Sequence, residues 1–121
     1  MDQSLREVAD RWLAEDPDPE TRAELRRLLD AGDEAALRDR FEGRLEFGTA
    51  GLRGVIGAGP NRFNRPVVIR TTAGFARYLA EQVPEARERG VVVGYDGRRL
   101  SRESAEDTAA GLAGHGIPAR I

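Results

Sequence analysis

The sequence has 121 residues, contains no cysteine and carries a formal net charge of −2. This length suits about one domain. The lack of cysteine excludes a disulfide framework and thiolate metal sites, and it suits a reducing, cytoplasmic environment. No apolar run approaches the roughly 20 residues needed to span a membrane, so we expect no membrane partner. The overall charge balance argues against a nucleic-acid partner.

The charges are unevenly divided along the chain. Residues 1–42 hold 13 acidic and 7 basic side chains, whereas residues 43–121 hold 8 acidic and 12 basic ones. The second part is therefore the one expected to attract an anion.

Residues 1–42 show the pattern of three short helices. Asp18 followed by Pro19 is typical of a helix start, Gly32 of a helix end and Asp33 of the N-cap of a third helix. Apolar side chains recur at helical spacing in the first two helices. They are Leu5, Val8, Ala9, Trp12 and Leu13, and then Leu25, Leu28 and Leu29. We expect this segment to form a helical N-terminal arm.

From residue 43 onward the pattern changes to alternating strands and helices. Residues 43–59 predict one or two short strands with tight bends, and Asn64 precedes a predicted helix. Residues 89–96 predict a strand buried on both faces, Ser101 opens a further helix, and residues 119–121 begin another strand. The side chains expected to be buried in the helix after Asn64 are Ile69, Ala73, Ala76, Leu79 and Val83.

This order of elements is typical of an α/β layer. We expect residues 43–121 to form an incomplete three-layer α/β/α domain with a mostly parallel mixed sheet. A strand that begins at Ala119 and stops at Ile121 leaves such a sheet unfinished, with an exposed edge. The sequence therefore predicts a fragment that contains the arm at 1–42 and a truncated domain at 43–121.

Residues 46–64 (EFGTAGLRGVIGAGPNRFN) suggest a loop that handles phosphate. Two common nucleotide-binding motifs do not fit. The P-loop requires a lysine, and the dinucleotide-binding fingerprint requires a third glycine that leads directly into a helix. What remains is Arg53, which lies between glycines. Glycine lets backbone N–H groups approach a ligand, an arginine fork binds phosphate through two hydrogen bonds, and Thr49 adds a hydroxyl donor. The alternative is a hairpin whose Arg53 pairs with a surface carboxylate.

Residues 94–101 (GYDGRRLS) follow the strongest predicted strand. Ligands of open α/β sheets bind at the carboxyl ends of strands, so Asp96 and Arg98 are candidate site residues. Alternatively, Asp96 bonds to nearby backbone in a turn and Ser101 is only an N-cap. An intermediate possibility is that Asp96 and Arg98 form an ion pair that shapes the site. His115, the single histidine, has no second ligand nearby in sequence, and we expect no catalytic role for it.

Three blocks together resemble the phosphohexomutase superfamily in their order and spacing. They are FGTAGLRG at 47–54, GPNRFN at 59–64 and GYDGRRLS at 94–101. Trp12 and the turn at 16–25 further resemble the branch of phosphoglucomutases and phosphopentomutases that has a helical N-terminal arm. The resemblance covers nearly the whole chain and implies the first, α/β domain of a four-domain isomerase.

The resemblance also implies a chemistry. Enzymes of this superfamily move a phosphoryl group between the 1- and 6-positions of a hexose, or the 1- and 5-positions of a pentose. They use a phosphoserine, a bound sugar bisphosphate such as glucose 1,6-bisphosphate, and Mg²⁺. The resemblance assigns Arg53, Thr49 and Gly51 to substrate binding, and Asp96 and Arg98 to support of the active cleft. The implied partners are a sugar phosphate substrate and the remaining domains of the same polypeptide.

The sequence departs from the superfamily pattern in several places. Its only serines are Ser4, Ser101 and Ser104, and none lies in a Thr-Ala-Ser-His-Asn-Pro-like phosphoserine loop. The Asp-x-Asp-x-Asp magnesium loop and the sugar-reading loop are also missing, and Ala50 stands where some relatives carry serine. We therefore expect neither a catalytic residue nor a metal ligand in this chain, and no activity from it alone.

Two other functions remain open from the residues themselves. A stand-alone module that binds an anion or a sugar phosphate without catalysis would use the same glycine-rich loop. A purely structural adaptor of helical and α/β parts would bind no sugar bisphosphate.

Overall fold

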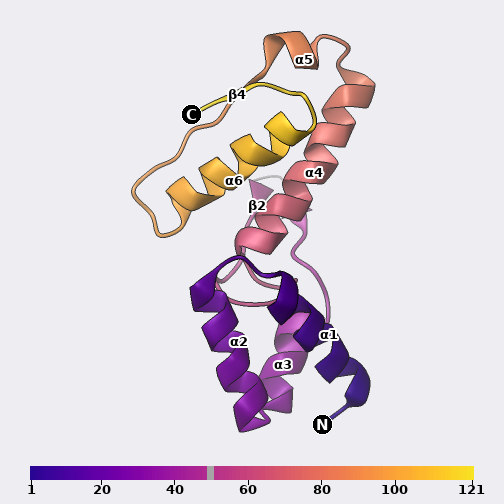
Figure 1. Ribbon diagram of the computed structural model, residues 1–121, viewed down its shortest axis with the longest axis vertical. Coiled ribbons are helices and arrows are strands. Elements are labelled where there is room, and N and C mark those ends of the chain that lie inside the picture. Colours follow the sequence, from indigo (N-terminus) through magenta and orange to yellow (C-terminus); the bar gives the residue numbers. More distant parts are fainter. Residues whose placement is uncertain (49–50) are drawn as a thin grey trace. The chain divides into compact units, whose positions relative to one another are not determined.

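Three helices occupy the first part of the chain. The structure is a computed structural model that describes residues 1–48 and 51–121 (Figure 1). The helices are α1 (Gln3–Glu15), α2 (Pro19–Ala31) and α3 (Glu34–Phe41). They confirm the predicted helical character of residues 1–42.

The ends of these helices follow the residues that the sequence singled out. The Asp18 carboxylate accepts a hydrogen bond from the backbone N–H of Glu20 at 2.9 Å, with Pro19 as the first helical residue. Gly32 ends α2 in the left-handed region, with φ of 64°, where glycine bears no Cβ penalty. Asp33 accepts from the N–H of Ala36 at 3.1 Å. The three predicted caps are confirmed.

The helices pack around an apolar core. Trp12 is buried and meets Phe41 edge-on, with ring centroids 6.0 Å apart, a favourable arrangement of two aromatic rings. Val8, predicted to face inward, is instead 42% exposed, because it lies at the edge of the apolar stripe of α1. The buried members of the core are Leu5, Ala9, Trp12, Leu25, Leu29, Leu37, Ala58 and Val67.

A buried carboxylate fixes the turn between α1 and α2. Asp16 accepts hydrogen bonds from the indole N–H of Trp12 at 3.2 Å, from the N–H of Asp18 at 2.9 Å and from the hydroxyl of Thr21. It is only 4% exposed. Since buried carboxylates require such partners, the turn has a defined geometry.

The glycine-rich segment forms a short antiparallel hairpin followed by a loop. β1 (Phe47–Gly48) pairs with β2 (Gly51–Leu52), with Phe47 opposite Leu52. An isolated bridge then joins Ile56 to Phe63. The prediction of one or two short strands in residues 43–59 is thus confirmed, and the two strands pair antiparallel.

The remaining elements alternate between helix and strand. The long helix α4 (Arg65–Gln82) follows Asn64, as predicted, and leads to the single turn α5 (Ala86–Arg89). β3 (Val91–Val92) precedes α6 (Ser101–Gly114), which leads to β4 (Ala119–Arg120).

β3 and β4 pair in parallel, with Val91 opposite Ala119. The helix α6 connects them, so the β–α–β order and the parallel pairing predicted for an α/β domain are confirmed. Their core contains Ala76 of α4, Leu112 of α6 and Ile117, all fully buried.

α4 and α6 approach each other closely at a glycine. A Cβ on Gly111 would lie 2.8 Å from Cγ2 of Thr72, closer than real side chains allow. The hydroxyls of Thr72 and Thr108 are 3.4 Å apart. The contact between the two hydroxyls lets Thr72, a polar residue, occupy a buried position of α4.

Two burial predictions are wrong. Ile69 is 39% exposed, and Val68, Thr72 and Ala76 form the buried stripe of α4 instead, because Thr72 satisfies its hydroxyl against α6. The strand predicted within residues 89–96 was expected to be buried on both faces, but Val92 of β3 is 83% exposed, while Val91 and Val93 pack on the core. Only one face of this strand is covered by the described residues.

The contacts group the chain into two compact units, Met1–Val67 and Val68–Ile121. The first contains the three N-terminal helices together with the glycine-rich segment. The boundary predicted between an arm at 1–42 and a domain from 43 stays a prediction. No helix in the described ranges is both long and apolar enough to cross a membrane.

Candidate functional site

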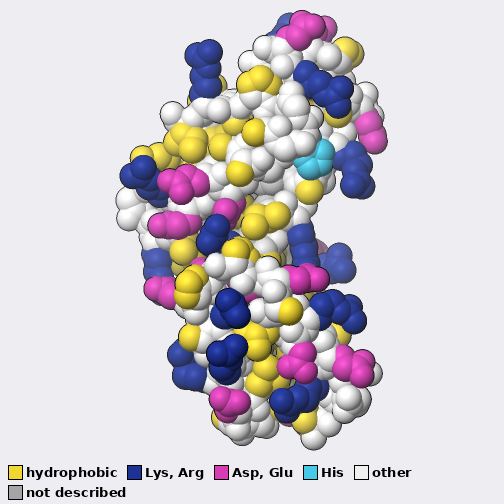
Figure 2. All heavy atoms as spheres, in the orientation of Figure 1, with side chains coloured by type: hydrophobic (Ala, Val, Ile, Leu, Met, Phe, Trp, Pro, Cys, Tyr) yellow, Lys and Arg dark blue, Asp and Glu magenta, His cyan; other side chains and the backbone are white. Residues whose placement is uncertain are grey.

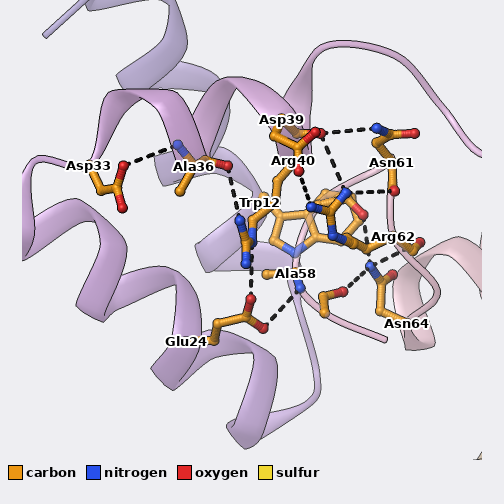
Figure 3. A network of polar contacts seen from close by, with 12 residues as sticks. Trp12, Glu24, Asp33, Ala36, Asp39, Arg40, Ala58, Asn61, Arg62 and Asn64 are labelled. Atoms are coloured by element: carbon orange, nitrogen blue, oxygen red, sulfur yellow. Dashed lines mark hydrogen bonds and ion pairs between the residues drawn. The ribbon is translucent and has the colours of Figure 1, made fainter. Parts of the chain in front are cut away.

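The loop after the hairpin, residues 57–64, is held from α2 by a carboxylate (Figure 3). One oxygen of Glu24 accepts a hydrogen bond from Nε of Arg40 at 3.0 Å, and the other accepts from the backbone N–H of Ala58 at 3.1 Å. Arg40 also donates to the carbonyl of Ala36 at 3.1 Å. Glu24 thereby joins α2, α3 and the loop through charge-assisted hydrogen bonds.

The end of α3 holds the same loop through its backbone. The carbonyl of Arg40 accepts from the N–H of Asn61 at 3.1 Å, and the Asn61 side chain donates to the carbonyl of Asp39 at 3.0 Å. Arg62 forms an ion pair with the Asp39 carboxylate and is largely buried. Arg62 is therefore used to hold the loop.

Gly59 allows the loop to reach α3. Its φ is +104°, and a Cβ there would lie 2.5 Å from the carbonyl oxygen of Arg40. A backbone oxygen cannot move aside as a flexible side chain does, so only glycine fits at this position.

Asn64 closes the loop from inside. Its side-chain N–H₂ donates to the carbonyls of Gly57 at 2.7 Å and Gly59 at 2.8 Å, and its oxygen accepts from the N–H of Val67 at 2.9 Å. The residue is 1% exposed. Sequence reasoning identified it as a helix start, and the structure adds that the same side chain shapes the loop.

Arg53 lies between the hairpin and this loop and is exposed. Its neighbour Leu52 packs against the core, and the carbonyl of Val55 accepts from the N–H of Phe63 at 2.8 Å. Within the described ranges, no hydrogen bond or ion pair engages the Arg53 side chain. The described residues thus give no counterpart for the alternative in which Arg53 pairs with a surface carboxylate, and the role of Arg53 stays a prediction.

The other residues assigned to substrate binding are only partly described. Thr49 and Ala50 lie outside the described residues. Gly51 belongs to β2, opposite Gly48. Their roles stay predictions.

The segment after β3 brings Asp96, Arg98 and Ser101 together. The Asp96 carboxylate accepts from the backbone N–H of Arg98 at 2.9 Å and pairs with its guanidinium at 3.0 Å. The hydroxyl of Ser101 accepts from the N–H of Asp96 at 3.0 Å. Both the local turn and the ion pair weighed for Asp96 are thus present.

These contacts change the acidity of Asp96. The hydrogen bond from the Arg98 backbone lowers the pKa of the Asp96 carboxyl, with further contributions from Ser101 and the Arg98 charge. The carboxylate is therefore kept ionised to lower pH than usual.

Ser101 is not the N-cap of α6, as one interpretation held. Leu100 occupies that position with φ of 66° and provides no side-chain hydrogen bond. Ser101 instead serves the Asp96 turn. A support role for Asp96 and Arg98 in a cleft stays a prediction, and the two groups of candidate residues belong to different units.

His115 lies at the end of α6, where a ring nitrogen is 2.9 Å from the carbonyl of Gly111. Among the described residues, no group of three or more acidic, histidine or cysteine side chains is placed to hold a metal ion. On the face shown in Figure 2, basic and acidic side chains are interspersed.

Sequence reasoning missed the contribution of Glu24 and Asp39. Both lie in helices, where they have the spacing of ordinary solvent-facing carboxylates. Their partners in the loop, Ala58 and Arg62, are 34 and 23 residues away. No local signal identified them.

Comparisons with known proteins identify the family to which the chain belongs. Residues 44–121 match the family model described as phosphoglucomutase/phosphomannomutase, alpha/beta/alpha domain I. No solved structure matches significantly.

The chain is also similar to curated proteins. A probable phosphoribomutase of Schizosaccharomyces pombe is 46% identical over 110 residues, which are 91% of this chain and 19% of that protein. A phosphopentomutase of Mus musculus is 39% identical over 124 residues, covering 98% of this chain and 20% of the relative. A glucose 1,6-bisphosphate synthase of Mus musculus is 39% identical over 123 residues, with coverage of 97% and 20%.

The chain spans about a fifth of the length of these relatives. The resemblance recognised from the three motif blocks is confirmed by the family match and by the relatives. The chain therefore belongs to the phosphoglucomutase/phosphomannomutase family, in its phosphopentomutase-like branch, and carries sequence of that family's alpha/beta/alpha domain I.

Proposed function

We propose that this chain is the N-terminal part of a phosphosugar mutase and contributes a phosphate-binding wall to its active site. The observation that carries the proposal is Arg53, an exposed arginine between glycines within the segment that matches the family model. The names of the relatives, phosphoribomutase and phosphopentomutase, support the reaction class.

The proposed chemistry is an intramolecular isomerisation. A phosphoryl group moves between the 1-position and the 5- or 6-position of a sugar through a phosphoserine and a sugar bisphosphate. Phosphoryl transfer depends mainly on positioning and charge neutralisation. The Arg53 guanidinium supplies a planar, permanently charged fork for the phosphate oxygens.

Asp96 and Arg98 have a supporting role in this proposal. Their ion pair and turn define the backbone after β3. A strand end of this kind is where α/β domains bind ligands. We assign Asp96 and Arg98 a structural role in supporting the cleft, and we assign them no role in proton transfer.

A pentose phosphate is the first substrate to test, because the phosphoribomutase and the phosphopentomutase are named for pentose chemistry. A sugar bisphosphate is the proposed activator, in keeping with a relative named glucose 1,6-bisphosphate synthase. When bound, Mg²⁺ would stabilise charge on the transferred phosphoryl group. The described residues do not form a site for it.

We further propose that the phosphoserine and the metal ligands come from other domains of the same polypeptide. The relatives are about five times longer than the matched region, which leaves room for such domains. The arginine wall alone then binds phosphate without turnover.

The test is the turnover of ribose 1-phosphate and glucose 1-phosphate by the mutase that contains this chain. Replacement of Arg53 by alanine is expected to lower kcat/KM by about a hundredfold, as with other charge-stabilising donors. Arg6, an exposed arginine of α1 paired with Asp10, provides a matched control, and Arg6→Ala should leave turnover unchanged. Equal activity of the Arg53→Ala and Arg6→Ala variants would contradict the proposed role. Binding of both sugars without turnover would favour the module without catalysis.

A further inference from the structure

We propose that Glu24 of α2 is a positioning residue for the segment that displays Arg53. This inference rests on the proposed function, because it concerns how the phosphate-binding arginine is held. It assigns a role in the site to a residue of the N-terminal helices, which lie before the segment that matches the family model.

Glu24 uses both carboxylate oxygens. Its two hydrogen bonds, to Arg40 and to the N–H of Ala58, are 3.0 and 3.1 Å long. The side chains of Glu24 and Arg40 are 25% and 20% exposed, so solvent screens the pair only partly. Ala58 is fully buried, and its N–H would lack this partner without the carboxylate.

The hold on Ala58 extends toward Arg53 through the backbone. The N–H of Gly57, next to Ala58, donates to the carbonyl of Phe63 at 3.2 Å. The N–H of Phe63 donates to the carbonyl of Val55 at 2.8 Å. Val55 is two residues from Arg53, so a shift of Ala58 would move the base from which Arg53 extends.

The other side of Arg53 is constrained as well. Leu52 packs on the core, and a Cβ on Gly54 would lie 2.6 Å from the side chain of Leu45. The N–H of Leu45 in turn donates to the carbonyl of Pro60 at 3.1 Å. Arg53 is thus an exposed side chain on a backbone that is fixed on both sides.

This arrangement has a functional consequence. A binding group held in place loses less freedom when its ligand arrives, and small misplacements of a site strongly reduce its effectiveness. Glu24 fixes the loop from a helix, which is more rigid than a loop.

The experiment compares variants of the full 121-residue chain with glucose 1,6-bisphosphate as the probe. Affinity is measured by NMR titration, and buried Trp12 reports by fluorescence that each variant is fully folded at the temperature used. Glu24→Ala removes both hydrogen bonds. Glu24→Gln keeps an oxygen for Ala58 but loses the charge opposite Arg40. Glu42→Gln is the matched control, because it removes one carboxylate from an exposed ion pair with Arg38.

The expected result is a graded loss of affinity. Glu24→Ala should weaken binding by about tenfold, less than the roughly hundredfold that a 1 Å misplacement can cost. Glu24→Gln should retain most of the affinity that Glu24→Ala loses, and Glu42→Gln should bind as tightly as the unaltered chain. Arg53→Ala should abolish binding. A role confined to stability would leave the affinity of the folded Glu24 variants unchanged.

Two outcomes would overturn the inference, and they can be told apart. If folded Glu24→Ala binds like the unaltered chain while Arg53→Ala does not bind, Glu24 has no positioning role and the proposed function stands. If Arg53→Ala binds like the unaltered chain, or the unaltered chain does not respond to the probe, the proposed function fails and the inference fails with it.

Discussion

The side-chain amide of Asn64 and the backbone carbonyl of Gly57 are joined by a 2.7 Å hydrogen bond in the interior of the first unit. The same amide reaches Gly59, and its oxygen caps the first turn of α4 at Val67. One side chain therefore shapes the loop after Arg53 and starts the helix that follows it.

Replacing Asn64 by alanine should destabilise the first unit. The change removes a helix cap and leaves two buried carbonyls without this donor, a loss of about 2–3 kcal/mol. Urea unfolding followed by the fluorescence of Trp12 measures it, since Trp12 is the only tryptophan and is buried. Asn61→Ala is the control, because Asn61 makes an exposed hydrogen bond to Asp39. Equal losses for both variants would contradict the role of Asn64.

Replacing Gly59 by alanine should cost more than the same change at Gly32. Both glycines have positive φ, so each substitution carries a backbone penalty of about 1–2 kcal/mol. At Gly32 nothing lies within 4 Å of an added Cβ, whereas at Gly59 it would meet the carbonyl oxygen of Arg40 at 2.5 Å. The difference in the free energy of unfolding isolates the contact with α3. If the two variants lost the same free energy of unfolding, the close contact between Gly59 and α3 would be contradicted.

Replacing Gly111 by alanine should destabilise the second unit by about 1–3 kcal/mol, because the new methyl overpacks against Thr72. The second change Thr72→Ser removes the clashing Cγ2 and keeps the hydroxyl near Thr108. The double variant should therefore be more stable than Gly111→Ala alone. Thermal unfolding followed by far-UV circular dichroism gives the coupling, and additive effects would rule the contact out.

The Asp96 carboxyl should titrate below the usual aspartate range in a carbon-detected NMR titration. The backbone N–H of Arg98 is the main cause of the lowered pKa, so Arg98→Ala should preserve most of the shift. A lowered pKa in the folded state stabilises the fold fully above the unfolded-state pKa, and this contribution is lost as pH falls through the folded-state value. An ordinary pKa for Asp96 in the unaltered chain would contradict the turn.

Local signals predicted much of the fold. The caps at Asp18, Gly32 and Asp33 depend on hydrogen bonds within three residues or on the φ of a single residue. Such features are encoded where they occur, and the helix ends matched their predicted positions. The parallel pairing of β3 and β4 followed from the alternation of strand and helix.

Tertiary contacts decided what the sequence could not predict. Thr72 is buried in place of Ile69 because Gly111 leaves space for its methyl group and Thr108 lies beside its hydroxyl. Gly111 and Thr108 are both more than 30 positions away in the sequence. Glu24 looks like a surface residue of α2, yet it bonds to Ala58. Arg53 was predicted as a site residue from its glycines, and its exposure agrees, but its role stays a proposal.

The most direct test of the central claim maps where the unaltered chain binds glucose 1,6-bisphosphate. Backbone amide shifts are followed by NMR during a titration with the probe. We expect the largest saturable shifts on residues 51–54, around Arg53. Shifts centred elsewhere, with residues 51–54 unaffected, would contradict the claim that the glycine-rich segment binds phosphate.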